Sequence, residues 1–211
     1  MLNYLLKPLA LVGLLLLSPI LIISVLFIFL EDGFPIFFVQ KRLGLNKKIF
    51  NLYKIRSMYK NTPSLGTHEV SEMHYLKVGS VLRILKIDEL PQVINYLKGD
   101  INLIGPRPSL PNQSDLTRHR EDNDIFSITP GITGLAQVLG YDMSNPSLLA
   151  KVDRMYIQNQ SIKMDLLIFI STFSILVSLK STEQTGLDLG IFYMLLLLVH
   201  SILLLQLIHH L

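Results

Sequence analysis

The chain has 211 residues, half of them hydrophobic and none of them cysteine. Its mean hydropathy of +0.44 is too high for an ordinary soluble domain, so we predict one water-facing domain with membrane segments, and the lack of cysteine excludes disulfides and thiolate metal sites. The net charge of +3 is uneven: residues 31–86 carry ten Lys/Arg against four Asp/Glu, whereas residues 87–165 carry seven against ten. The excess of basic residues over 31–86 predicts that this half binds an anionic surface or substrate. Nucleic acid is the weaker candidate, because no nucleic-acid-binding motif occurs.

The first element is the apolar run Leu9–Leu30, which has 22 residues and no charge. As one helix it would reach about 33 Å, enough to cross a bilayer core. Ser18-Pro19 near its middle predicts a kink or a break, where Ser18 can bond a carbonyl that the proline leaves free. Two interpretations follow: a kinked spanning helix, which length alone favours, and a helix-break-helix hairpin that enters one leaflet and returns. Six cations between positions 41 and 56 place the following domain in the cytoplasm.

The next segments alternate between short elements and turns. Residues 49–58 predict a strand that would carry Lys54 and Arg56 on one face. The polar residues 61–72 predict a loop, and residues 78–85 predict a short helix that places Arg83 just before two adjacent carboxylates.

Those carboxylates, Asp88 and Glu89, are followed by Pro91, an apolar-periodic stretch and Gly99. Pro near the start and Gly just past the end predict a short helix, so the acidic pair should lie at its mouth, beside unpaired backbone N–H groups. Such a place can bind phosphate or hold a carboxylate beside a cation. Taken alone, the dipeptide is more often an acidic N-cap that stabilises its helix.

The second half continues with constrained turns and further helices. Gly105-Pro106-Arg107-Pro108 should be rigid and non-helical. Residues 116–124 predict a solvated helix or loop, residues 130–134 a constrained turn and residues 147–160 a helix. Residues 166–179 suit an interfacial or core helix, and residues 191–208 either span the membrane or lie on it. Three histidines at 200, 209 and 210 lack converging partner ligands, so they are poor metal candidates.

The run Lys86–Pro108 resembles the bacterial sugar transferase family, the polyprenyl-phosphate hexose-1-phosphate transferases. The likeness extends in one colinear order over residues 1–180, which is more specific than any single motif. The matching pieces are the following segments: Ser18-Pro19, Gln40, Arg42, Gly44, Phe50, Tyr53–Met58, Asp88–Gln92, Asn95, Leu97–Asp100, Ile104–Pro108 and Pro130–Val138.

The resemblance implies an α/β, mostly helical fold of the small monotopic form. It implies a re-entrant N-terminal membrane hairpin over 1–34, broken at Ser18-Pro19, and a catalytic domain over 35–180 with interfacial amphipathic helices. A C-terminal hydrophobic helix over 187–211 would follow. The implied location is the bacterial inner membrane, with the catalytic domain on its cytoplasmic face.

The implied activity is transfer of a sugar-1-phosphate from a nucleotide-sugar, usually a UDP-sugar, to polyprenyl phosphate such as undecaprenyl phosphate, with release of UMP. This would be the first membrane step of glycan assembly. By resemblance Asp88 is a covalent nucleophile, which forms an aspartyl-phosphosugar intermediate, and Glu89 binds Mg²⁺. A single direct displacement is the alternative. Beyond these substrates, a homodimer or downstream glycosyltransferases are the candidate partners.

The remaining candidate site residues are cations and a glycine-rich turn. Arg107, held between two prolines, suits a bidentate phosphate contact, and Arg83, Lys54 and Arg56 are further phosphate candidates. The alternative for each is a solvated surface cation. The nucleotide candidates follow: Gly134, Gln137 and Tyr141.

One feature departs from the family pattern. Thr129 and the segment Leu139-Gly140-Tyr141 stand where related sequences often carry arginines, which puts those donor contacts in doubt. Tyr141 could stack on a base instead, and Gln137 could simply cap backbone groups. Two other functions stay open: a non-enzymatic membrane-anchored scaffold of a glycan-assembly complex and a Mg²⁺-dependent lipid phosphatase. No motif identifies the sugar.

Overall fold

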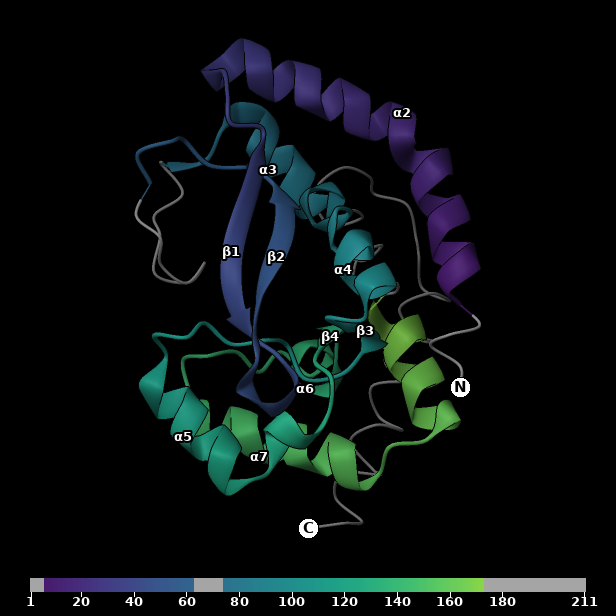
Figure 1. Ribbon diagram of the computed structural model, residues 1–211, viewed down its shortest axis with the longest axis vertical. Coiled ribbons are helices and arrows are strands. Elements are labelled where there is room, and N and C mark those ends of the chain that lie inside the picture. Colours follow the sequence, from purple (N-terminus) through teal and green to yellow (C-terminus); the bar gives the residue numbers. More distant parts are fainter. Residues whose placement is uncertain (1–5, 63–73, 173–211) are drawn as a thin grey trace, which may run out of the picture. The chain divides into compact units, whose positions relative to one another are not determined.

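The computed structural model describes residues 6–62 and 74–172. These residues are mostly helical, with two small two-stranded sheets (Figure 1), which confirms the predicted fold class at this level. By packing, the chain divides into two compact units, Met1–Arg42 with Ile49–Asp100 and Leu43–Lys48 with Ile101–Leu211. The predicted loop over 61–72, the hydrophobic helix over 187–211 and the three C-terminal histidines lie wholly or mostly outside the described residues. The predicted domain boundaries stay predictions.

The first unit begins with helix α2, Lys7–Asp32, which runs for 26 residues without a non-helical break. Among the described residues it is the one helix long and apolar enough to cross a membrane. Figure 1 shows its axis changing direction along its length. A kink or a break was predicted at Ser18-Pro19, and the helix runs through both residues without a break. Pro19 has no N–H to donate to the Leu15 carbonyl, and Ser18 Oγ donates to that carbonyl instead at 2.7 Å, as predicted.

The strands and short helices that follow α2 in the first unit pack against this helix. Strands β1 (Phe37–Leu43) and β2 (Ile49–Ile55) form a hairpin across the turn η1 (Leu45–Lys47). Helix α3 (Lys77–Ile84), the turn η4 (Ile87–Glu89) and helix α4 (Gln92–Lys98) follow. Buried side chains from α2, β2, α3 and the residues just before β1 and α3 share one core, which consists of Ile28, Ile36, Ile55, Leu76 and Leu82. The core thus joins the apolar helix to the elements that carry the acidic pair.

Two glycines fix local geometry in this unit. Gly99 ends α4 with φ of +85°, a conformation that glycine adopts without steric cost, so the predicted helix stop is confirmed. Gly79 lies in α3 where a β-carbon would come within 2.1 Å of the Ser57 carbonyl oxygen. Only glycine therefore lets α3 approach the end of β2 this closely.

The second unit is built on a short parallel sheet. Strand β3 (Asn102–Ile104) pairs with β4 (Gly131–Thr133), Asn102 lying opposite Gly131. Helices α5 (Ser114–Asp122), α6 (Leu135–Val138) and α7 (Pro146–Gln158), the turn η5 (Ile125–Ser127) and helical residues 162–172 surround it. The predicted helix over 147–160 is confirmed as α7. Asn145 caps it by accepting a bond from the Leu148 N–H at 3.1 Å.

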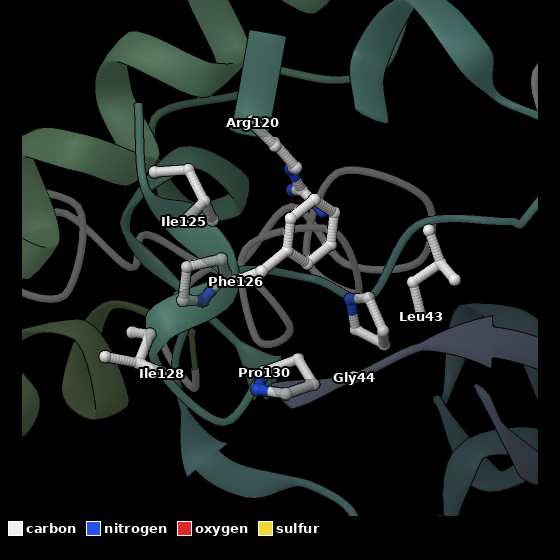
Figure 2. Close-up of a pocket in the computed structure, with 9 residues that line it drawn as sticks. Leu43, Gly44, Arg120, Ile125, Phe126, Ile128 and Pro130 are labelled. Carbon is white, nitrogen blue, oxygen red and sulfur yellow. The ribbon is translucent and has the colours of Figure 1, made fainter. Parts of the chain in front are cut away.

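Figure 2 shows the side chains around a small cavity in the second unit. Its volume is about 10 Å³, room for no more than a single water molecule. Arg120, Phe126 and Pro130 are among the residues that line it. This cavity cannot hold a nucleotide-sugar, so it belongs to the packing of the unit.

Candidate active site

Asp88 and Glu89 lie in the turn η4, between α3 and α4. Lys86 precedes them with a left-handed φ of 57°, which ends α3 and redirects the chain. The acidic pair therefore precedes α4, as predicted. The prediction that backbone N–H groups beside the pair are unpaired is wrong for four amides. In tight turns each of these N–H groups donates to the carbonyl three residues earlier in the chain. The amides so bonded are those of Glu89, Leu90, Val93 and Ile94.

Asp88 is a buried carboxylate, 5% exposed. Its Oδ1 is buried and has no hydrogen-bond partner within residues 6–62 and 74–172. Burial raises the pKa of Asp88, and the neighbouring charge of Glu89 raises it further; Lys54, Arg83 and Lys86 act in the opposite direction. An unpaired, desolvated carboxylate among cations is the environment expected of a reactive anion.

Glu89 has a different environment, because its carboxylate is paired. Its Oε1 accepts a bond from Lys54 Nζ at 2.9 Å, and both side chains are largely buried. Asn95 of α4 fastens β2 at two residues just before Lys54. Its Oδ1 accepts from the Tyr53 N–H at 3.1 Å and its Nδ2 donates to the Asn51 carbonyl at 2.7 Å. The fully buried Asn95 therefore fixes the strand that presents Lys54 to the acidic pair.

Arg83 approaches the acidic pair from α3. Its guanidinium lies 4.5 Å from the centre of the Tyr75 ring, a cation–π contact that limits its freedom. Residues 57–59 pair with residues 74–76 and hold that tyrosine in place. The first unit thus brings Arg83 and Lys54 together with Asp88, and adds Lys86, which the sequence analysis missed although it stands two residues before Asp88.

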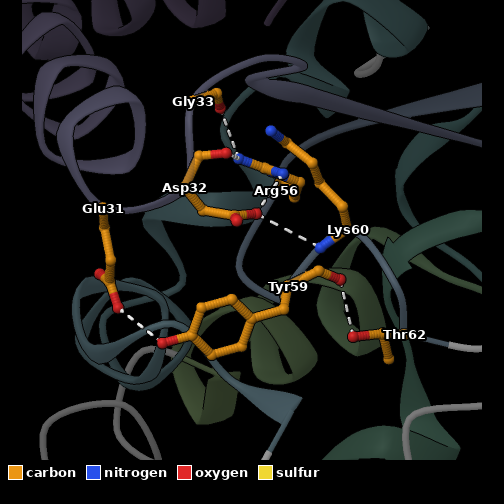
Figure 3. A network of polar contacts seen from close by, with 7 residues as sticks. All are labelled: Glu31, Asp32, Gly33, Arg56, Tyr59, Lys60 and Thr62. Atoms are coloured by element: carbon orange, nitrogen blue, oxygen red, sulfur yellow. Dashed lines mark hydrogen bonds and ion pairs between the residues drawn. The ribbon is translucent and has the colours of Figure 1, made fainter.

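Arg56 lies just past the end of β2, with a role distinct from that of Lys54. Its guanidinium donates to Asp32 Oδ2 at 2.7 Å and to the Gly33 carbonyl at 2.6 Å (Figure 3). The side chain is 6% exposed. In the structure this charge fastens the end of α2, and the phosphate role of Arg56 stays a prediction.

Glu31, next to Asp32, links the end of α2 to the helix that carries Arg83. Its carboxylate accepts bonds from the Lys77 N–H at 2.7 Å and the Val78 N–H at 3.2 Å. Tyr59 also donates to it at 3.3 Å, as Figure 3 shows. The N-terminal amides of α3 have no partner within their own helix, so Glu31 caps α3 from a distant part of the chain.

In the second unit, Arg107 lies on a non-helical loop, as predicted. Its carbonyl accepts a bond from Arg120 Nη1 at 2.7 Å, and Arg120 Nη2 donates to Asp153 Oδ2 at 2.6 Å. The Arg120 and Asp153 side chains are 2% and 3% exposed. The prediction that residues 116–124 are simply solvated is therefore wrong for Arg120, which turns inward to reach both partners.

The two glycine-containing loops of this unit pack backbone against backbone. A β-carbon on Gly131 would lie 2.2 Å from the Gly105 nitrogen, and one on Gly134 would lie 2.2 Å from the Gly105 oxygen. Gln137 Nε2 donates to the Ile132 carbonyl at 3.1 Å, which is the capping contact weighed as the alternative to a nucleotide contact. Tyr141 is 38% exposed. The nucleotide roles of Gly134, Gln137 and Tyr141 stay predictions.

Comparison with known proteins decides the family. Residues 5–179 match the family described as bacterial sugar transferase. The chain belongs to this family. The match confirms the family predicted from the sequence and, with the named relatives below, the predicted enzyme class, a phosphoglycosyl transferase.

Several curated sugar transferases are similar to the chain. They include an uncharacterized sugar transferase, EpsL, of Bacillus subtilis, 36% identical over 80% of this chain. UDP-N-acetylgalactosamine-undecaprenyl-phosphate N-acetylgalactosaminephosphotransferase of Aeromonas hydrophila is 37% identical over 77% of this chain. UDP-glucose:undecaprenyl-phosphate glucose-1-phosphate transferase of Caulobacter vibrioides is 35% identical over 74% of it. The chain spans 83% of the length of the first of these proteins, but 40% and 61% of the other two.

The acidic pair of this sugar transferase suits a hard divalent cation. Mg²⁺ is usually held by one or two carboxylates together with substrate phosphates, rather than by a complete protein cage. Within the described ranges no cluster of three or more His, Cys, Asp or Glu side chains could hold a metal. The adjacent Asp88 and Glu89 carboxylates, one with an unpartnered oxygen, fit the sparser arrangement.

Proposed function

We propose that the chain transfers a sugar-1-phosphate from a UDP-sugar to a polyprenyl phosphate such as undecaprenyl phosphate, and releases UMP. One observation carries this proposal: the buried Asp88 carboxylate has an unpartnered oxygen and three cations act on it. Family membership supports the reaction class, and the names of the relatives from Aeromonas hydrophila and Caulobacter vibrioides support the donor and acceptor classes.

The proposed chemistry has two displacements at one phosphorus atom. An Asp88 oxygen attacks the sugar-bearing phosphorus, the bond from that phosphorus to the bridging oxygen breaks, and UMP leaves with the bonding electrons. The acyl phosphate on Asp88 then holds the phosphosugar. A phosphate oxygen of polyprenyl phosphate attacks the same phosphorus, which frees the Asp88 carboxylate and forms the polyprenyl diphosphosugar.

Cations make this attack feasible, because one anion must approach another. Lys54, Arg83 and Lys86 lower the charge repulsion around Asp88. Glu89, beside Asp88, would hold Mg²⁺, and a bound ion would supply positive charge to offset the donor diphosphate. The phosphate contact predicted for Arg107, whose carbonyl accepts a bond from Arg120 in the second unit, stays a prediction.

The proposed reaction is tested by following label and nucleotide together. Purified protein is given undecaprenyl phosphate, Mg²⁺ and a panel of UDP-sugars labelled in the sugar. We expect label to enter the lipid fraction with one UMP released per transfer. Inorganic phosphate released from a lipid diphosphate, without labelled lipid, would instead indicate the lipid phosphatase. If neither labelled lipid nor inorganic phosphate forms with any donor, the result would favour the non-enzymatic scaffold.

We also propose that α2 is a re-entrant anchor, with both of its ends on the cytoplasmic face of the inner membrane. At its start, Lys7 Nζ donates to the Leu97 carbonyl at 3.0 Å. At its end, Asp32 pairs with Arg56. All four residues belong to the first unit, and bonds from both ends of the helix to one unit support the proposal that both ends lie on the same side of the bilayer.

Single cysteines test this topology, since the chain contains no cysteine of its own. We expect Asn3→Cys, before α2, and Lys48→Cys, an exposed position of the water-facing part, to react alike with a membrane-impermeant maleimide. Both should be labelled in inside-out vesicles and protected in intact spheroplasts. Labelling of Asn3→Cys from the outside alone would show a spanning helix and refute the re-entrant anchor.

A further inference from the structure

Gln92 is a second polar side chain buried beside the acidic pair without a full set of partners. It is 3% exposed, and its Nε2 is buried with no hydrogen-bond acceptor anywhere in the described part of the chain. Buried amide groups nearly always find a partner, because a lost hydrogen bond to water is not otherwise replaced. An unpartnered donor at this depth therefore needs an explanation.

The burial pattern places Gln92 on the same face as Asp88. The backbone stays right-handed helical from η4 through Leu90 and Pro91 into α4. Along this run the buried polar and aromatic side chains are Asp88, Gln92, Asn95 and Tyr96. These residues occupy positions i, i+4, i+7 and i+8, which lie on one face of a helix, so Gln92 leaves the chain about one turn after Asp88.

The two unpartnered atoms on this face are chemically complementary, but they do not bond to each other. Asp88 Oδ1 is an acceptor and Gln92 Nε2 is a donor. A bound group that engages both atoms must approach or react with the carboxylate oxygen, and it must also accept a hydrogen bond from the amide N–H. A phosphoryl group does both, because its phosphorus is electrophilic and its non-bridging oxygens accept hydrogen bonds.

We propose that Gln92 is a further catalytic residue, whose Nε2–H donates to a non-bridging oxygen of the phosphoryl group that Asp88 attacks. This inference rests on the proposed function, and it assigns to Gln92 a contact that strengthens as negative charge builds on that oxygen. Asn95, on the same face, cannot serve in this way because both ends of its amide are bonded within the unit.

The test compares size-matched variants of two glutamines. Gln92→Met removes the donor at similar volume, and we expect the kcat for UMP release to fall about a hundredfold with the donor KM little changed, as for the loss of one oxyanion donor. Its Tm should not fall, because an unpartnered amide is removed. Gln113→Met is the control, because Gln113 Oε1 accepts a bond from the Leu110 N–H at 2.9 Å. Loss of this bond should lower Tm and leave kcat unchanged.

A pre-steady-state burst of UMP in the absence of acceptor separates chemistry from folding. Loss of the Gln92 contact should slow the rate constant of the burst, whereas partial unfolding would reduce only its amplitude. Gln92→Glu should be slower still, because a second anion would face the phosphoryl oxygens. If Gln92→Met fails to fold, Gln92→Asn, which keeps the amide but shortens its reach, takes its place in the same measurement.

The outcomes distinguish this inference from the function on which it rests. A burst rate constant at the wild-type level in the Gln92 variants, with Asp88→Asn inactive, would overturn the role of Gln92 and leave the proposed function standing. A kcat that only follows the loss of Tm across the Gln92 variants would overturn it as well. Turnover by Asp88→Asn would instead overturn the proposed covalent function.

Discussion

Replacing Asp88 with asparagine is expected to abolish transfer while leaving the protein at least as stable as the wild type. Asparagine has nearly the same shape but is no nucleophile, so we expect turnover to fall by at least about a thousandfold, the scale seen when a covalent nucleophile is removed. The side chain is buried and its Oδ1 makes no hydrogen bond within the described residues, so the exchange breaks no bond at that oxygen.

The stability half of this prediction follows from the raised pKa of Asp88. The folded protein holds a proton on this carboxyl more tightly than the unfolded chain does. The free energy of unfolding therefore falls as the pH rises from the pKa of Asp88 in the unfolded chain through its raised pKa in the folded protein. This loss of stability persists at neutral pH. Asparagine does not ionise, so Asp88→Asn should remove that cost and flatten this part of the stability profile.

The pair of measurements is UMP release and thermal unfolding across a pH series. In the wild type, activity should fall on acidification through the raised pKa of Asp88, because only the ionised carboxylate attacks. Asp115→Asn is the matched control, since the Asp115 side chain is 59% exposed in α5; it should keep its activity. Turnover of Asp88→Asn at the wild-type level would exclude the aspartyl intermediate.

Replacing Arg120 with alanine is expected to cost about 3–5 kcal/mol of unfolding free energy, because one partner of a buried ion pair is left without its counterion. The change leaves the buried Asp153 carboxyl without its counterion and removes the donor to the Arg107 carbonyl. The main effect should therefore be on folding of the second unit, with activity lost alongside it.

Arg118→Ala in the same helix is the control for Arg120. The Arg118 side chain is 70% exposed and pairs with Asp115 on the surface, so its loss should cost less than about 1 kcal/mol. Replacing both buried partners, in Arg120→Met with Asp153→Leu, should recover much of the stability because no uncompensated charge remains. Denaturant titration of the four proteins in detergent measures this, and equal losses for Arg118 and Arg120 would contradict the buried pair.

Features governed by neighbouring residues could be predicted from the sequence. Ser18 donates to the carbonyl that Pro19 leaves without a donor, and Gly99 ends α4, both as predicted. Asp88 also lies just before α4, as predicted. Each of these depends on steric or hydrogen-bonding preferences that act within about one helical turn, so no knowledge of the tertiary fold was needed.

Partners distant in the chain could not be predicted in the same way. Lys54 bonds Glu89 across 35 positions, and Arg120 bonds Asp153 across 33. A charged residue in the sequence carries no indication of which opposite charge it will meet, so Arg56 and Lys54 looked equivalent. The burial of Arg120 in a highly charged helix gave no periodic signal, since only Leu116 shares its buried face in α5.

The acidic residues that end α2 make this helix more than a means of attachment. Glu31 supplies the cap of α3, and Asp32 neutralises the buried Arg56. A protein shortened to begin at Gly33, in the hope of obtaining a soluble catalytic fragment, would lose both carboxylates at once. Such a fragment should be insoluble or inactive for reasons internal to its fold, and detergent-solubilised or lipid-embedded full-length protein is the appropriate material for enzymology.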